Sequence, residues 1–141
     1  MPSSKEFLDN SDIAIFGISP KRRTFAGTVN DYLLKAGYKT YPVHPDGASG
    51  HFDSPERLPD VAQAAYIATG PDNTKSIVES LKDGRIKSIW FQNGSFNKEI
   101  LGRCDGAGIK TYTGCLMMYI PEAGFIHRFH RAIHELFSGR Q

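Results

Sequence analysis

Residues 12–23 read DIAIFGISPKRR, and this stretch decides the fold that the sequence predicts. It opens with a short apolar run, Ile13–Phe16, of the length expected for a strand that is buried on both faces. A glycine, a small hydroxyl residue and a proline follow, and then three consecutive cations. Residues 25–36 carry apolar side chains at helical spacing, so the pattern predicts a strand, a glycine turn and a helix in succession.

The junction after this strand is the first candidate binding site. A strand that passes through a glycine turn into a helix gathers backbone N–H groups and the positive end of the helix dipole at one place. Lys21, Arg22 and Arg23 add positive charge beside it. This combination predicts a site for a phosphorylated ligand, although a KRR triplet is also compatible with a solvated loop.

The alternation of strand and helix continues along the chain. Further strands are expected at residues 38–43, 64–69, 87–91 and 109–112, and helices at 24–36, from 71 onward, at 97–106 and at 122–138. A short helix or arm is expected at residues 3–11, and residues 46–59 form a loop. This pattern predicts an α/β fold, with a Rossmann-like, doubly wound parallel sheet of five strands in the order 3-2-1-4-5 between helical layers.

Length and composition narrow the class of protein. A chain of 141 residues fits a single domain, residues 1–141. Cys104 and Cys115 make no disulfide framework, and zinc-ligand spacing is missing, so reduced thiols in a cytoplasmic protein without a metal site are expected. No apolar run reaches the ~18 residues of a membrane span. A net charge of +2 does not indicate a nucleic-acid partner.

The predicted topology gathers several segments around one crevice. In a doubly wound sheet, ligands bind beyond the carboxyl ends of the strands, where the winding reverses. Residues 17–25, 43–45, 69–74 and 92–94 are expected there. The fingerprint GxGxxG, an acid at the end of the second strand and the P-loop pattern are missing, which disfavours an ordinary NAD enzyme or NTPase. The three cations suit a ligand with several phosphates, such as coenzyme A (CoA).

Five short motifs follow one another along the chain: IFGISP at 15–20, GYKTYPVHP at 37–45, GPDNT at 70–74, IWFQNG at 89–94 and GCLMM at 114–118. As a set they resemble the small stand-alone CoA-binding proteins, which are similar to the CoA-binding domain of the succinyl-CoA synthetase α subunit. The resemblance implies a Rossmann-like fold with CoA or acyl-CoA in the crevice. The second domain of the synthetase, with its phosphorylated histidine, has no counterpart in this length, so the resemblance supports binding and not catalysis.

The resemblance also suggests where the parts of the ligand lie. Gly17, Ser19 and the cations would face the phosphates, residues 43–45 and 70–71 would border the adenosine, and Thr74 stands at the second helix start. Some members carry Asn at the position of His44 and a basic residue at that of Gly70. The candidate cofactor-binding residues are Gly17, Ile18, Ser19, Pro20, Lys21, Arg22, Arg23, Thr24, Phe25, Val43, His44, Pro45, Gly70, Pro71, Thr74, Gln92 and Asn93.

Several side chains have a second interpretation. Ser19 serves either a phosphate or a helix cap, and Gln92 bonds either the ligand or neighbouring backbone. Phe25 and Trp90 fit the core or a pocket wall better than a stacking contact with adenine. No catalytic residue is assigned.

The helix expected at residues 122–138 offers a separate hypothesis. His127, His130 and His134 border its apolar stripe, which favours boundary histidines over a metal site at a dimer contact. The same helix is the candidate contact of a homodimer. Two alternatives to a CoA-binding protein stay open: a small acyl-CoA-handling enzyme that uses Cys115 or His44, and an NADP- or nucleotide-binding or regulatory interaction module.

Overall fold

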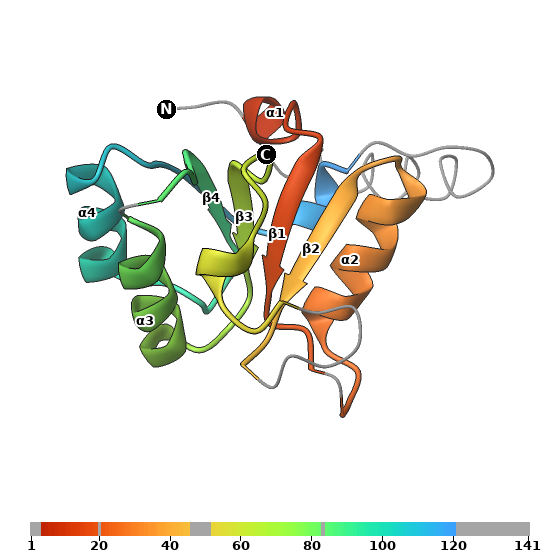
Figure 1. Ribbon diagram of the computed structural model, residues 1–141, viewed down its shortest axis with the longest axis horizontal. Coiled ribbons are helices and arrows are strands. Elements are labelled where there is room, and N and C mark those ends of the chain that lie inside the picture. The colour runs from red at the N-terminus through yellow and green to blue at the C-terminus, as the bar shows by residue number, and fades with distance from the viewer. Residues whose placement is uncertain (1–3, 20, 46–51, 83, 121–141) are drawn as a thin grey trace.

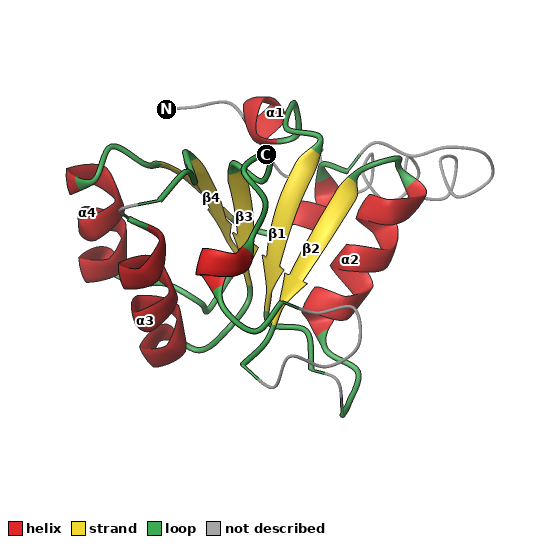
Figure 2. Cartoon of the chain, viewed as in Figure 1, coloured by secondary structure: helices red, strands yellow, loops and turns green. Residues whose placement is uncertain are grey.

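The computed structural model describes residues 4–19, 21–45, 52–82 and 84–120, and a five-stranded parallel sheet lies at its centre. Helix α2 covers one face of the sheet, and helices α3 and α4 cover the other (Figure 1). The described residues also include three short helical segments (Figure 2). The predicted Rossmann-like α/β fold is confirmed. The elements are α1 (Ser4–Phe7), β1 (Asp12–Phe16), α2 (Phe25–Lys35), β2 (Lys39–Val43), the 3₁₀ turn η1 (Pro55–Arg57), β3 (Ala64–Ile67), α3 (Pro71–Leu81), β4 (Ser88–Phe91), α4 (Lys98–Gly106), β5 (Lys110–Thr113) and η2 (Leu116–Met118).

The predicted strand order 3-2-1-4-5 is wrong. The observed order is β2-β1-β3-β4-β5, so β3 pairs with β1 and β4 and does not lie at the edge beside β2. The reason is visible in the two sequences. Pro42 of β2 has no N–H to donate, which confines its strand to an edge, whereas all four residues of β3 are buried, as a central strand requires. The winding therefore reverses between β1 and β3.

Alternation along the strands divides the core between the two faces of the sheet. Ile13 and Ile15 point to the face that α2 covers, where they pack with Ala26, Val29 and Leu33. Ala14 and Phe16 point to the opposite face, in one cluster with residues of α3 and α4 such as Val78, Leu81, Ile100 and Cys104. This arrangement follows from the period of two in a strand and fixes the helices on both sides of β1.

The helix ends confirm much of the predicted turn chemistry. Thr24 precedes α2, and its Oγ1 accepts a hydrogen bond of 3.2 Å from the Gly27 N–H. Thr24 is thus the cap of α2, and Ser19 has a different contact: its Oγ accepts a 3.1 Å hydrogen bond from the Lys21 N–H. Pro71 occupies the start of α3, as predicted.

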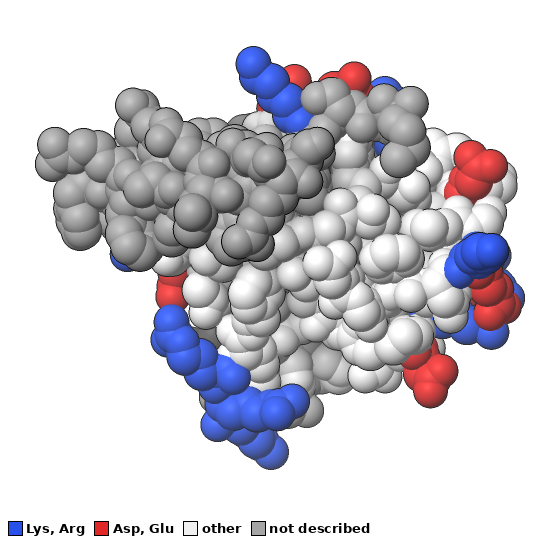
Figure 3. Space-filling model, turned by 180° about the vertical axis from the view of Figure 1, so that it is seen from behind, with Lys and Arg blue, Asp and Glu red and all other residues white. Residues whose placement is uncertain are grey.

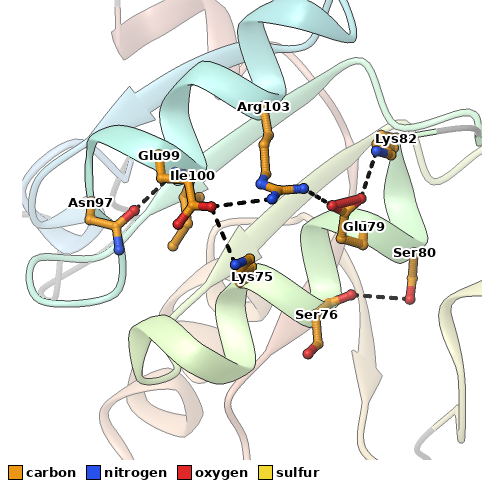
Figure 4. Close-up of polar contacts among 9 residues, drawn as sticks. All are labelled: Lys75, Ser76, Glu79, Ser80, Lys82, Asn97, Glu99, Ile100 and Arg103. Carbon is orange, nitrogen blue, oxygen red and sulfur yellow. Dashed lines mark hydrogen bonds and ion pairs between the residues drawn. The ribbon is translucent and has the colours of Figure 1, made fainter.

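A network of ion pairs holds α3 against α4 (Figure 4). Arg103 of α4 contacts Glu79 of α3, and it also lies 3.2 Å from Glu99. Lys75 of α3 reaches Glu99 at 3.2 Å, and Lys82 reaches Glu79 at 2.7 Å. Hydrogen bonds from Lys82 to Glu79 and from Arg103 to Glu99 lower the pKa of each carboxyl group. The network lies on the α4 side of α3, and another side of α3 faces the cleft described below.

Two of the predictions lie outside the described residues. These are Pro20 and the helix at residues 122–138, with its histidines and the dimer contact. Within the described ranges, every helix is too short or too polar to cross a bilayer.

Candidate functional site

A cleft of about 630 Å³ opens at the carboxyl ends of β1, β2 and β3, where the winding reverses. Its walls are the loop after β1, the end of β2 with the segment at 53–55, and the loop after β3 with one side of α3. The size suits a nucleotide-sized ligand. The lining residues are Phe16, Gly17, Ile18, Ser19, Arg22, Thr24, Val43, His44, Pro45, Asp53, Pro55, Ala68, Thr69, Gly70, Asn73, Ser76, Ile77 and Ser80.

Gly17 forms the point of closest approach between the ends of β1 and β3. Its φ is +122°, and an added Cβ would lie 2.7 Å from the Ala68 carbonyl oxygen. The Ala68 N–H meanwhile donates a 2.9 Å hydrogen bond to the Phe16 carbonyl. Only glycine fits both the backbone conformation and the space at this wall of the cleft.

The three predicted cations separate in space. Arg22 lines the cleft, while Arg23 lies 3.9 Å from Asp31 on the exposed side of α2. Arg22 and Arg23 also border a smaller hollow of about 250 Å³ beside the first turns of α2. In Figure 3, positive charge gathers at the lower corner of this side of the molecule, next to a largely uncharged surface. Ser19, Arg22 and Thr24 line both the cleft and the smaller hollow, and Arg23 lines the smaller hollow alone. The loop therefore places positive charge beside both cavities.

The cleft brings together part of the predicted set. Gly17, Ile18, Ser19, Arg22, Thr24, Val43, His44, Pro45 and Gly70 line it. The remaining described candidates do not line it: Lys21, Arg23, Phe25, Pro71, Thr74, Gln92 and Asn93.

Two of these outlying residues have clear structural partners. Thr74 is fully buried, and its hydroxyl lies 2.7 Å from the Thr69 hydroxyl and donates to the Thr69 carbonyl at 3.1 Å, which fixes the loop after β3. Gln92 accepts a 2.9 Å hydrogen bond from the Tyr66 hydroxyl. Burial raises the pKa of Tyr66, so its hydroxyl keeps the proton that it donates.

Four residues line the cleft from one side of α3: Asn73, Ser76, Ile77 and Ser80. Asn73 belongs to the range 69–74 that was expected at the crevice, and the other three lie beyond every range that the sequence predicted there. Their spacing of three and four residues is a helical signal that the sequence carries. Asp53 is different, because it reaches the cleft through the pairing of its neighbour Phe52 with Val43, and no local sequence pattern predicts that pairing.

A comparison with protein families matches residues 11–121 to a model described as "CoA binding domain". The chain belongs to this CoA-binding family. The match covers the loops after β1, β2 and β3, which are the walls of the cleft. It confirms the predicted resemblance and supports CoA as the kind of ligand.

Solved structures agree on the fold. A hypothetical protein from Pyrococcus horikoshii is 26% identical, with a TM-score of 0.72 over 93% of this chain and 92% of that one. A conserved hypothetical protein from Pyrococcus furiosus is 24% identical, with a TM-score of 0.67 over 74% and 93% of the two chains. A protein from Thermus thermophilus is 22% identical, with a TM-score of 0.68 over 79% and 91%. A search among curated proteins found no match.

Proposed function

We propose that this chain acts as one CoA-binding domain that holds coenzyme A or an acyl-CoA in the cleft, without catalysis of its own. The observation that carries the proposal is the position of the cleft. It lies at the reversal of the winding, between the Gly17 turn and the first turn of α3, and the CoA-binding family model spans all of its walls.

The β1–α2 loop supplies the chemistry that phosphates require. Backbone N–H groups at the start of α2 and the positive end of its dipole favour an anion. Arg22 adds a charge-assisted donor on the wall of the cleft, and Ser19 adds a hydroxyl. Lys21 and Arg23 stand outside the cleft and raise the local potential without a direct contact. The adenosine is then expected at Val43–Pro45 and Gly70.

The placement of the thiols supports binding over thiol chemistry. Cys104 is fully buried in α4, and burial raises the pKa of its thiol to about 11. Cys115 follows β5, two strands from β3, and does not line the cleft. Neither sulfur is therefore expected to meet a thioester held between β1 and β3.

Calorimetric titration with CoA, dephospho-CoA and NADP⁺ tests the proposal. CoA is expected to bind most tightly, and Arg22→Ala to weaken it at least about tenfold, as the loss of a charge-assisted contact does. Lys87→Ala is the matched control, because it removes the same charge from an exposed residue just before β4, at the amino end of the strands and so away from the cleft. Its affinity should stay within about twofold of the parent. The proposal is wrong if CoA gives no saturable heat, or if Arg22→Ala and Lys87→Ala behave alike.

A further inference from the structure

An acidic side chain stands in a cleft that is otherwise suited to an anion. Asp53 lines the same cavity as Ser19 and Arg22. A carboxylate repels the phosphates of a nucleotide wherever it faces them. Its presence is therefore informative about which part of the ligand lies on that side of the cleft.

The backbone holds Asp53 at this place. The residue before it, Phe52, donates a 2.8 Å hydrogen bond to the Pro42 carbonyl and accepts one of 2.8 Å from the His44 N–H. The Phe52 ring also lies 6.2 Å from that of Tyr41, between ring centres. Phe52 is thus paired to the end of β2, which delivers the next residue to the cleft beside His44.

A structural role accounts poorly for this carboxylate. Its Oδ1 lies 2.9 Å from Arg57 Nε, but the side chains of Asp53 and Arg57 are 48% and 71% exposed. Ion pairs this open to water contribute little to stability. The pair does orient the carboxylate, which is still about half exposed.

We propose that Asp53 accepts a hydrogen bond from the adenosine end of the ligand and so fixes the direction in which CoA lies. This inference rests on the proposed function. In dinucleotide-binding folds an acid at the end of the second strand holds the ribose hydroxyls. Here β2 ends without an acid, and Asp53 comes back to that end through Phe52. The cleft then carries opposite charges for opposite ends of the ligand: Arg22 for the phosphates and Asp53 for a neutral N–H or O–H donor.

The direction in which CoA affinity changes when the charge of Asp53 is removed tests this assignment. If Asp53 merely adds negative charge, Asp53→Asn should tighten the binding of polyanionic CoA. If its carboxylate accepts a hydrogen bond, Asp53→Asn should weaken CoA about fivefold and Asp53→Ala about tenfold, because charged acceptors bond more strongly than neutral ones. Calorimetric titration of the full chain with CoA and dephospho-CoA measures both variants.

Glu56→Gln is the matched control, since Glu56 is exposed on η1 and does not line the cleft. It should leave CoA affinity unchanged or slightly tighter. Dephospho-CoA separates two sources of the donor: a changed ratio of the two affinities in Asp53→Asn indicates a ribose hydroxyl, and equal weakening indicates the adenine amine. Unchanged or tighter binding in Asp53→Asn overturns the inference while the parent still binds CoA. A parent that does not bind CoA overturns the proposed function instead.

Discussion

At the ends of β1 and β3 polar residues line a cleft, whereas Gln92 and Ser95 beyond β4 lie outside it and form hydrogen bonds within the protein. Ser19, Arg22 and Asn73 line the cavity. Beyond β4, Gln92 accepts from the Tyr66 hydroxyl at 2.9 Å, and its carbonyl accepts a 2.6 Å hydrogen bond from the Ser95 hydroxyl. The loops after β1 and β3 belong to the lining of the cleft, and the turn after β4 lies outside it.

The difference comes from the direction in which the chain leaves the sheet. After β1 the chain passes to α2 on one face, and after β3 it passes to α3 on the other, so the two loops diverge and leave a space. After β4 the chain returns to the face that α3 already covers, and α4 packs beside α3 through the ion pairs of Figure 4. The cleft therefore lies where the connections after β1 and β3 separate, and the connection after β4 packs against α3.

The largest expected effect concerns two glycines with nearly the same backbone. Gly17 ends β1 with φ +122°, and Gly114 follows β5 with φ +119°. Alanine at either position would strain the backbone, which lowers the free energy of unfolding by about 1–3 kcal/mol. Only at Gly17 does the new Cβ also meet a carbonyl, that of Ala68, at 2.7 Å, whereas a Cβ added at Gly114 meets no described side chain or non-adjacent backbone atom within 4 Å. Gly17→Ala should lower the free energy of unfolding by about 3 kcal/mol or more and abolish CoA binding.

Urea unfolding and calorimetric titration check this pair. Gly114→Ala is the control, and it should cost about 1 kcal/mol and keep CoA affinity. Equal losses of stability in the two variants would mean that backbone strain alone governs both strand ends, and that the close approach of β1 to β3 does not shape the cleft.

The next effect concerns the hydrogen bonds at the end of β4. Tyr66 is fully buried, and Tyr66→Phe removes the hydroxyl that donates to Gln92. The change should lower the free energy of unfolding by about 1 kcal/mol, the net contribution of one such bond, without changing CoA affinity. A double-mutant cycle with Gln92→Ala measures the coupling between the two residues. A loss of CoA affinity in either variant would show that the end of β4 takes part in the site.

The sequence predicted the parts of this fold better than their order. Apolar runs, glycine turns and capping residues are local signals, and they located β1, α2, β3 and α3 within a few residues. Strand order depends on pairing between distant segments. Pro42 is the residue that indicates the order, since it makes β2 an edge strand. The predicted order 3-2-1-4-5 does not use this signal and places the loop after β4 at the crevice.

The candidate site follows the same division. Gly17, Ser19 and Arg22 belong to one local motif and line the cleft. Gln92 and Asn93 were included because the predicted order placed β4 next to β1, whereas β3 separates them. Asp53 was missed because its position depends on hydrogen bonds between Phe52 and the end of β2, which no periodicity in the sequence reveals.

The smallest expected effect compares two exposed asparagines that follow neighbouring strands, β3 and β4. Asn73 stands in the first turn of α3 after β3 and lines the cleft, while Asn93 stands in the turn after β4 and does not. Asn73→Ala should weaken CoA about fivefold, the effect of one neutral hydrogen bond, and Asn93→Ala should leave the affinity within about twofold. Thermal unfolding should change little in either variant, because both side chains are exposed. If Asn93→Ala weakens CoA binding as much as Asn73→Ala does, then the ligand extends past β3. The turn after β4 would then belong to the site together with the loops after β1 and β3.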